Sequence, residues 1–253
     1  MRFFLMLSMA VYAPLHAGVT VITDGDFQPA NWSQVVFNQV NGTGTNSRQA
    51  AGGNPDAYRQ MAMAFQPVAA GTNLNINIAS FGSLLTYDPS AGGAIQQIRF
   101  DYDLSRISST GLGSTTPAGF YRPFLEQGGK RFFLAGVDDQ VLLSAWTAFH
   151  HVSTDPNDWG QINAGVEKPD FSASGGVITF GYRVALPLIC PAGVTSGCLA
   201  AAAVSGIDNF KVTVTSADPA GTVPEPSAGA LVGLGAIAAT LWRKRGLGLR
   251  SSR

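Results

Sequence analysis

The 253-residue sequence predicts an all-β fold, an antiparallel β-sandwich, flanked by two apolar ends that are not part of it. In the middle of the chain, hydrophobic side chains alternate with polar ones, which is typical of strands with one buried face. Clusters of Gly, Pro, Asn, Asp and Ser separate these stretches, and only the two ends have sustained helical periodicity or long apolar runs. Short strands with regular turn signals favour a sandwich.

The first 17 residues have the composition of a secretory signal peptide. Arg2 supplies a positive charge, Phe3–Val11 is apolar, and Pro14 interrupts the helix before the small residue Ala17. This order is that of a leader that is removed during export. We expect cleavage after Ala17, and the alternative is a short N-terminal membrane anchor.

Residues 18–219 form the predicted sandwich domain, which is large enough to bury a proper core. The whole chain is neutral, but six of its 16 basic residues lie in the two ends, whereas all 16 acidic residues lie between Asp24 and Glu225. The exported part thus has ten basic and 16 acidic residues, a net charge of −6. This balance argues against nucleic acid and anionic surfaces as partners.

Seven stretches are predicted strands. In four of them the expected buried faces carry Leu74, Ile76 and Ile78; Ile98, Phe100, Tyr102 and Leu104; Ile178, Phe180, Tyr182 and Val184 within Gly176–Leu186; and Phe210, Val212 and Val214 within Asn209–Ser216. Three further candidates are Tyr58–Phe65, Arg131–Val137 and Val141–Phe149. The turn-forming clusters Asn41–Asn54, Asp88–Gly93, Ser108–Gly119 and Asn157–Gly165 are expected to connect them.

Cys190 and Cys198 are the two cysteines, and a Gly- and Pro-containing segment separates them. An exported protein meets an oxidising compartment, so we predict a disulfide between two strands. Closing so short a loop stabilises the fold by about 2–3 kcal/mol in the chain-entropy treatment. A metal site is the alternative, but no histidine lies nearby in sequence, and a Cys-x-x-Cys redox motif is absent.

The C-terminal segment has three ordered parts. Pro224, Glu225 and Pro226 end a linker at residues 220–226, the charge-free span Ser227–Trp242 follows, and a basic tail at residues 243–253 opens with Arg243, Lys244 and Arg245. A helix over this span is about 24 Å long at ~1.5 Å per residue, shorter than the ~30 Å hydrocarbon core. Basic residues next to an apolar helix stay on the cytoplasmic side. We predict that this span is a single transmembrane helix. The alternatives are that it anchors the protein in the membrane permanently, or that it is a buried Ala/Gly helix.

The order of Pro-Glu-Pro, apolar span and basic cluster resembles the PEP-CTERM sorting signal of Gram-negative bacteria over roughly residues 222–246. The resemblance implies an exosortase as partner, a membrane-embedded transpeptidase that recognises Pro224-Glu225-Pro226 and removes the helix. It implies export across the inner membrane, an inner-membrane intermediate, and then the cell surface or extracellular matrix. The extension from Gly246 to Arg253 departs from the pattern, because such signals usually end sooner.

Two segments are similar to the opening and closing strands of galactose-binding-like jelly rolls, namely Asp24–Phe27 with Trp32, and Gly206–Val214. The resemblance implies a jelly-roll-like sandwich, a class in which many members bind carbohydrate and many do not. It also implies a structural Ca²⁺ held by Asp26 and Asp208, since carboxylate oxygens suit this ion. The alternative is that Asp26 belongs to a turn and that Asp208 caps the final strand. No other cofactor is expected.

His150 and His151, with Asp155 and Asp158, form the polar cluster that could suggest metal binding or acid–base catalysis. Adjacent residues of a strand point to opposite faces, so the two histidines cannot ligate one ion from a regular strand. The sequence from Asp155 to Asp158 also favours a turn. We therefore interpret the cluster as a solvated strand end.

Two carboxylate pairs could be imagined as a glycosidase pair, which needs carboxyl groups about 5–10 Å apart across a cleft. Asp101 and Asp103 fall on the polar face of a predicted strand, and Asp138 and Asp139 lie between two strands as an expected hairpin turn. A nucleophile elbow and a phosphate-binding loop are absent. We expect no catalytic residues, so the protein is predicted not to be an enzyme.

Exposed aromatic rings are the usual platforms for sugars, and the candidates are Trp32, Trp146, Trp159 and Tyr121. Large aromatic residues in a sandwich are more often part of the core. The sequence does not decide between these roles.

The function predicted from these features is that of an exported, non-catalytic surface or matrix protein associated with exopolysaccharide or biofilm. A carbohydrate-binding module with a defined glycan is the alternative, and an exported hydrolase is a third class. The expected partners are an exosortase, the membrane through the C-terminal helix before processing, and exopolysaccharide, but not nucleic acid.

Overall fold

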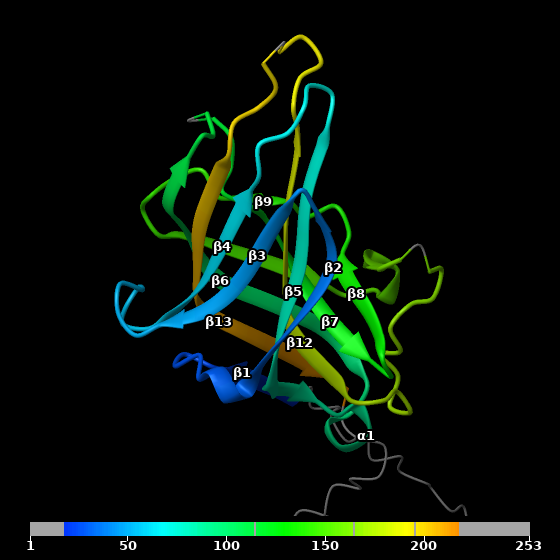
Figure 1. Cartoon of the computed structure of the whole chain (residues 1–253). Helices are drawn as coiled ribbons and strands as arrows, with labels where there is room; N and C mark the ends of the chain where they lie inside the picture. Colours follow the sequence, from blue (N-terminus) through cyan, green and yellow to red (C-terminus); the bar gives the residue numbers. More distant parts are fainter. Residues whose placement is uncertain (1–17, 114, 164, 195, 218–253) are drawn as a thin grey trace, which may run out of the picture. The chain divides into compact units, whose positions relative to one another are not determined.

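The computed structural model describes residues 18–217, except 114, 164 and 195 (Figure 1). The predicted leader, the Pro224–Pro226 motif, the span Ser227–Trp242 and the basic tail lie outside these residues. Among the residues described, no helix is both long and apolar enough to cross a bilayer.

The described residues form two antiparallel sheets, which confirms the predicted all-β sandwich and is consistent with a jelly-roll-like fold. In the six-stranded sheet the order is β10 (Thr147–Ser153), β6 (Ile95–Thr110), β13 (Ala201–Ser216), β4 (Tyr58–Phe65) and β3 (Gly42–Gln49), with β1 (Gly18–Thr23) also paired to β13. In the seven-stranded sheet it is β11 (Trp159–Gln161), β8 (Lys130–Leu134), β7 (Phe120–Gln127), β12 (Ile178–Ile189), β5 (Asn73–Tyr87) and β2 (Trp32–Val40), with β9 (Asp139–Gln140) paired to β7. The helical segments are α1 (Pro89–Gly92) and the 3₁₀ turns η1 (Pro29–Asn31) and η2 (Pro156–Asp158).

The core lies between the two sheets and is built largely from aromatic side chains. Every residue that alternation placed on a buried face is buried, from Leu74 on β5 to Val214 on β13. Phe100 on β6 meets Phe180 on β12 edge-on, with ring centroids 5.8 Å apart. Such aromatic contacts across the two layers add to the apolar area that each ring buries.

The predicted connection Asn41–Asn54 is wrong, because Gly42–Gln49 within it is strand β3. This strand pairs with β4 along its whole length, from Gly42 opposite Phe65 to Gln49 opposite Tyr58. Its small and polar residues do not alternate with apolar ones, so the pairing with β4 determines its structure. Gly44 lets the strand approach β5, since a Cβ there would lie 2.6 Å from Ile78 Cδ1.

Other boundaries also differ from the sequence prediction. Val141–Trp146 is irregular, and the predicted strand there begins only at Thr147. The predicted connections at Ser108–Gly119 and Asn157–Gly165 contain the end of β6 and all of β11, respectively. Strands β1, β2 and β7 were not predicted, because β1 and β2 expose residues on both faces and β7 buries three consecutive residues.

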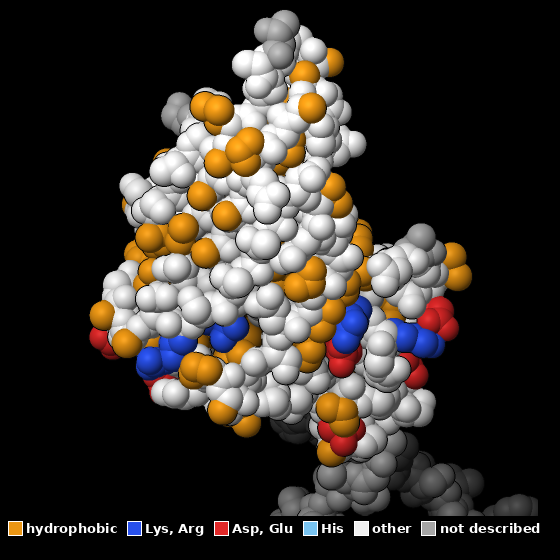
Figure 2. Space-filling view, in the orientation of Figure 1, with side chains coloured by type: hydrophobic (Ala, Val, Ile, Leu, Met, Phe, Trp, Pro, Cys, Tyr) orange, Lys and Arg blue, Asp and Glu red, His pale blue; other side chains and the backbone are white. Residues whose placement is uncertain are grey.

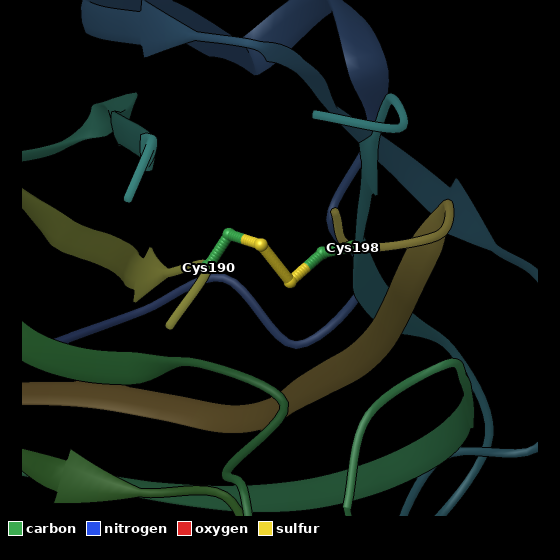
Figure 3. Close-up of a disulfide and its surroundings, with 2 residues drawn as sticks. All are labelled: Cys190 and Cys198. Carbon is green, nitrogen blue, oxygen red and sulfur yellow. A yellow bond between two sulfur atoms is a disulfide. The ribbon is translucent and has the colours of Figure 1, made fainter. Parts of the chain in front are cut away.

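The predicted disulfide is confirmed. It joins Cys190, just after β12, to Cys198, shortly before β13, and the two Cα atoms are 5.7 Å apart (Figure 3). The backbones of Cys198 and Val68 exchange two hydrogen bonds of 2.9 and 3.0 Å. The disulfide loop is therefore tied to the connection between β4 and β5.

Charged residues are unevenly distributed over the domain. Residues 60–87, 107–121 and 184–207 contain no Asp, Glu, Lys or Arg. Figure 2 accordingly shows the charged side chains of this face in the lower half of the view, whereas the upper end is hydrophobic or uncharged. Arg122 and Arg183 each border one of these uncharged stretches in the sequence.

Candidate functional site

Two adjoining hollows of about 220 and 500 Å³ lie on the outer face of the seven-stranded sheet. Both are lined by Asn77, Arg122 and Arg183. Asn75, Phe120 and Asp138 complete the polar and aromatic wall of the smaller hollow, and Phe37 and Phe133 contribute to the larger one. We call the two hollows together the sheet groove.

Strand alternation explains why these residues face outward. On β12, Tyr182 and Val184 are fully buried in the core, so Arg183 between them points to the opposite face. The antiparallel register places Arg183 directly opposite Arg122 on β7. It also places Pro187 and Ala185 of β12 opposite Asn75 and Asn77 of β5. The groove therefore crosses three neighbouring strands.

The two arginines of the groove share one aromatic ring. The guanidinium carbons of Arg183 and Arg122 lie 4.8 and 5.0 Å from the centre of the Phe133 ring. Arg122 donates two hydrogen bonds to Asp138, from Nε to Oδ1 at 2.7 Å and from Nη2 to Oδ2 at 2.6 Å. This pairing of a planar guanidinium with a carboxylate neutralises Arg122.

Arg183 has no such partner among the residues that the structure describes. Its Nε donates to Asn77 Oδ1 at 2.7 Å, and the two Nη groups make no hydrogen bond within the described part of the chain. Burial, and then the neighbouring Arg122, lower the pKa of Arg183 to about 10. The group remains protonated at neutral pH, so the groove carries one positive charge in excess.

The groove also contains an acceptor without a donor. The side-chain oxygen Oδ1 of Asn75 is buried, and no hydrogen-bond donor reaches it within the described residues. Leaving a buried acceptor unmatched costs about 1–3 kcal/mol, so such a group calls for an explanation.

The predicted calcium ligands Asp26 and Asp208 have separate partners. The exposed Asp26 forms an ion pair with Arg48, with Nη2 and Oδ1 2.6 Å apart. Asp208 is buried and accepts hydrogen bonds from the backbone N–H groups of Asn54 and Asn209. Burial raises the pKa of Asp208. Within the described residues, no group of three or more His, Cys, Asp or Glu side chains is placed to hold a metal ion, and calcium binding stays a prediction.

The adjacent histidines point to opposite faces of β10, as expected: His150 is exposed, whereas His151 is partly buried. The interpretation of His151 as solvated is wrong, because its Nε2 lies 2.7 Å from Asp139 Oδ2. The hairpin turn predicted at Asp138 and Asp139 is also wrong. Asp139 belongs to β9, is buried, and accepts a 2.5 Å hydrogen bond from the Tyr102 hydroxyl.

Three of the other acidic candidates serve local structure. Asp155 and Asp158 form a reciprocal capping box at η2, in line with the predicted turn. Asp101 forms ion pairs with Arg99 and Lys211, at N···O distances of 2.7 and 3.3 Å. The remaining one, Asp103, accepts hydrogen bonds from the side-chain amides of Asn54 and Asn209. None of these four carboxylates lines the sheet groove.

The aromatic candidates lie mostly in the core. Trp32, Trp159 and Tyr121 are buried, while Trp146 is partly exposed and packs edge-on against Tyr58 with ring centroids 5.4 Å apart. The aromatic residues of the groove are Phe37, Phe120 and Phe133, which sequence reasoning missed. One signal was present: Arg183 interrupts the otherwise uncharged strand β12.

Comparison with known proteins gives a clear match at one end of the chain only. Residues 222–245 match the family model of the PEP-CTERM protein-sorting motif. No curated protein matches the chain. One solved structure, that of infectious bursal disease virus strain Gx, matches with a TM-score of 0.19 and 10% identity over 70% of this chain, a likeness too weak to carry an argument. This chain spans only 40% of that viral chain. The matched motif confirms the predicted sorting signal: residues 222–245 are a PEP-CTERM protein-sorting motif, which implies export to the envelope or surface of a Gram-negative bacterium and processing by an exosortase.

Proposed function

We propose that this protein is a non-catalytic component of the cell surface or extracellular matrix that associates with exopolysaccharide. The observation that carries the proposal is the PEP-CTERM motif at residues 222–245, which assigns the chain to an export and sorting route. The sandwich domain is then the part that acts outside the cell.

Delivery follows from the order of the segments. The leader is removed, the domain folds outside the inner membrane, and Ser227–Trp242 holds the chain in the bilayer while Pro224-Glu225-Pro226 is presented to the exosortase. Two prolines fix the backbone around Glu225, so the motif loses little conformational entropy when it binds an enzyme groove. Removal of the span releases the domain from the inner membrane.

The partners of the acidic residues support binding rather than hydrolysis. Asp101 is held by two cations, and Asp139 lies between Tyr102 and His151 in a buried position. Neither lines the sheet groove, where the one carboxylate contributed by the described residues is that of Asp138, already bound to Arg122. A glycosidase needs two carboxyl groups across one cleft, so a saccharide in this groove would be held but not cleaved.

The alternative function, a carbohydrate-binding module with a defined glycan, is favoured by the groove itself. Its larger hollow of about 500 Å³ falls within the ~300–1,000 Å³ typical of small-molecule sites. Amide, guanidinium and aromatic groups line it together, which suits a ring that carries hydroxyl groups on its edge. The two functions are compatible, since a matrix protein can be retained through such a module.

Fractionation of the producing bacterium tests the proposal. We expect the processed protein to sediment with the cells' own exopolysaccharide and to move to the soluble fraction after the polysaccharide is depolymerised. A protein that distributes identically in a strain lacking the polysaccharide would contradict the association.

A further inference from the structure

The sheet groove has a charge that the domain does not neutralise. Two guanidinium groups and one carboxylate face each other there, and Arg122 already binds the carboxylate of Asp138 through two hydrogen bonds. Arg183 is half-buried, is held in place by Asn77 and Phe133, and keeps both Nη groups free of partners among the described residues. A fixed, partly desolvated guanidinium of this kind binds a planar anion through two parallel hydrogen bonds.

A second feature of the groove indicates a ligand with hydrogen-bond donors. Asn75 lines the smaller hollow next to Arg183, and its buried Oδ1 has no donor within the described residues. An inorganic anion such as sulfate has no donor to offer this atom at neutral pH. A sugar hydroxyl would satisfy it once the Asn75 amide turns toward the hollow, since Oδ1 is screened from solvent in this structure.

Aromatic rings form part of both hollows. Phe120 lines the smaller one and Phe37 and Phe133 the larger one, and all three rings are only partly buried. Faces of such rings pack against the apolar face of a pyranose, while the polar edge of the sugar meets Arg183 and Asn75. The central strand β12 is hydrogen-bonded on both sides, to β5 and β7, so it offers no free edge to an extended peptide.

We propose that the sheet groove binds an acidic saccharide, in which a uronic acid carboxylate pairs with Arg183 and a ring hydroxyl donates to Asn75. This inference rests on the proposed association with polysaccharide and names the chemical class of the sugar. The geometry of Arg122 with Asp138 shows that the groove accommodates a guanidinium–carboxylate pair.

The net charge of the exported part, −6, restricts the kind of polymer. At long range it repels a continuous polyanion, whereas the Arg183 contact acts only at short range. The expected ligand is therefore a polysaccharide in which single acidic sugars are spaced among neutral ones.

Titration calorimetry on the full-length chain in detergent tests this directly. The probes are three oligosaccharides that each carry one uronic acid: an aldotetraouronic acid from glucuronoxylan, a glucuronate–galactose disaccharide and a galacturonate–rhamnose disaccharide. Each is compared with its uncharged methyl ester. We expect at least one acid to bind about tenfold or more tightly than its ester, since a hydrogen bond to a charged group contributes on this scale. Equal affinities for acid and ester throughout the panel, or binding of none, would overturn the inference without any variant.

Matched variants then assign the site. Arg183→Gln should weaken binding of the acid about tenfold and leave binding of the ester unchanged. Arg131→Gln removes the same charge from the same sheet outside the groove, where Arg131 pairs with Glu126, and should change neither affinity. Asn75→Ala should weaken both ligands relative to the control Asn73→Ala on the same strand. Equal losses in Arg183→Gln and Arg131→Gln would show that net charge alone matters and would refute the groove.

Two further arms separate this inference from the proposed function. A glutamate-rich peptide that binds more tightly than every uronic acid would replace the saccharide by a protein partner and overturn the inference. If the wild-type protein sediments with native exopolysaccharide and Arg183→Gln does so equally well, the groove assignment fails while the matrix function stands. If the wild type does not sediment but still prefers acid to ester, the matrix function fails and the groove chemistry stands.

Discussion

Arg122 and Arg183 lie directly opposite each other on β7 and β12, and both guanidinium groups stack on the ring of Phe133. Among the residues that the structure describes, a carboxylate, that of Asp138, pairs with Arg122 but none pairs with Arg183. One guanidinium in the groove is therefore neutralised and the other keeps its charge. Like charges placed side by side and partly desolvated work against folding. Charged groups perturbed in this way cluster at functional sites, which favours a role in binding.

Arg183→Met should therefore leave the folded state as stable as the wild type, or make it more stable by up to about 1 kcal/mol. The substitution removes a charge whose pKa is lowered to about 10 by burial and Arg122, which means that folding disfavours its protonated form. The penalty is fully present below this folded-state pKa, because Arg183 is protonated in both states there. It shrinks as the pH rises through about 10 toward the unfolded value.

Urea unfolding at several pH values measures this effect. The free energy of unfolding of Arg183→Met minus that of the wild type should be constant from pH 6 to 9. Above pH 10 this difference should decrease, because the penalty that Arg183 imposes on the wild type shrinks there. A loss of more than about 1 kcal/mol in the variant at pH 7 would show instead that Arg183 is a structural residue.

Asp138 and Asp139 are neighbours with different expected roles in stability. Asp139→Ala should cost about 2–3 kcal/mol, because the Tyr102 hydroxyl and His151 lose a buried acceptor. Asp138→Ala removes a carboxylate that is half exposed and should cost no more than about 1 kcal/mol. The free energies of unfolding of the two variants check the difference, and equal costs would mean that Asp139 is as solvated as a turn residue.

Gly44 should not tolerate a side chain. In Gly44→Ala the new Cβ would lie 2.6 Å from Ile78 Cδ1 and 2.7 Å from Ile76 Cγ2, both in the core. Crowding of this kind costs about 1–3 kcal/mol. Gly176→Ala, where no atom lies within 4 Å of the added Cβ, is the matched control and should change stability by less than about 0.5 kcal/mol. If thermal unfolding shows no difference between the two variants, β3 does not pack against β5 as described.

The surroundings of Gly44 and Asp139 are features of the fold that the sequence did not predict. The alternation of apolar and polar residues predicted the buried strand faces correctly, because residues such as Phe100 and Tyr182 show this pattern within the sequence of a single strand. Strand β3 has no such pattern. Its position depends on pairing with β4 and on a close approach to β5, which the sequence of the strand alone does not reveal. The burial of Asp139 likewise depends on Tyr102 and His151, which come from two strands of the other sheet.

The two candidate sites also differ in whether the sequence could predict them. The sorting motif at residues 222–245 was predictable because it is contiguous, and an enzyme reads it as a linear sequence. The sheet groove was not, because Asn75, Arg122 and Arg183 become neighbours only through the register of three strands. The aromatic residues that the sequence suggested as sugar platforms lie mostly in the core, and phenylalanines occupy the groove instead.

Pro224→Ala combined with Glu225→Ala should leave the protein in the inner membrane with its C-terminal span attached. The change removes the rigid backbone and the carboxylate that the exosortase is expected to recognise, but it leaves the apolar span intact. Immunoblotting of membrane and extracellular fractions, with tags on both sides of the motif, measures the outcome. Substitution of Arg250 and Arg253 by Ala, beyond the matched motif, serves as the control and should be processed normally.

The most direct test of the exported and processed state is the intact mass of protein collected from outside the cell. The leader and the apolar span should both be absent, so the predicted mass corresponds to a chain that begins at Gly18 and ends before Ser227. A mass that still includes Trp242 would contradict the removal of the C-terminal span.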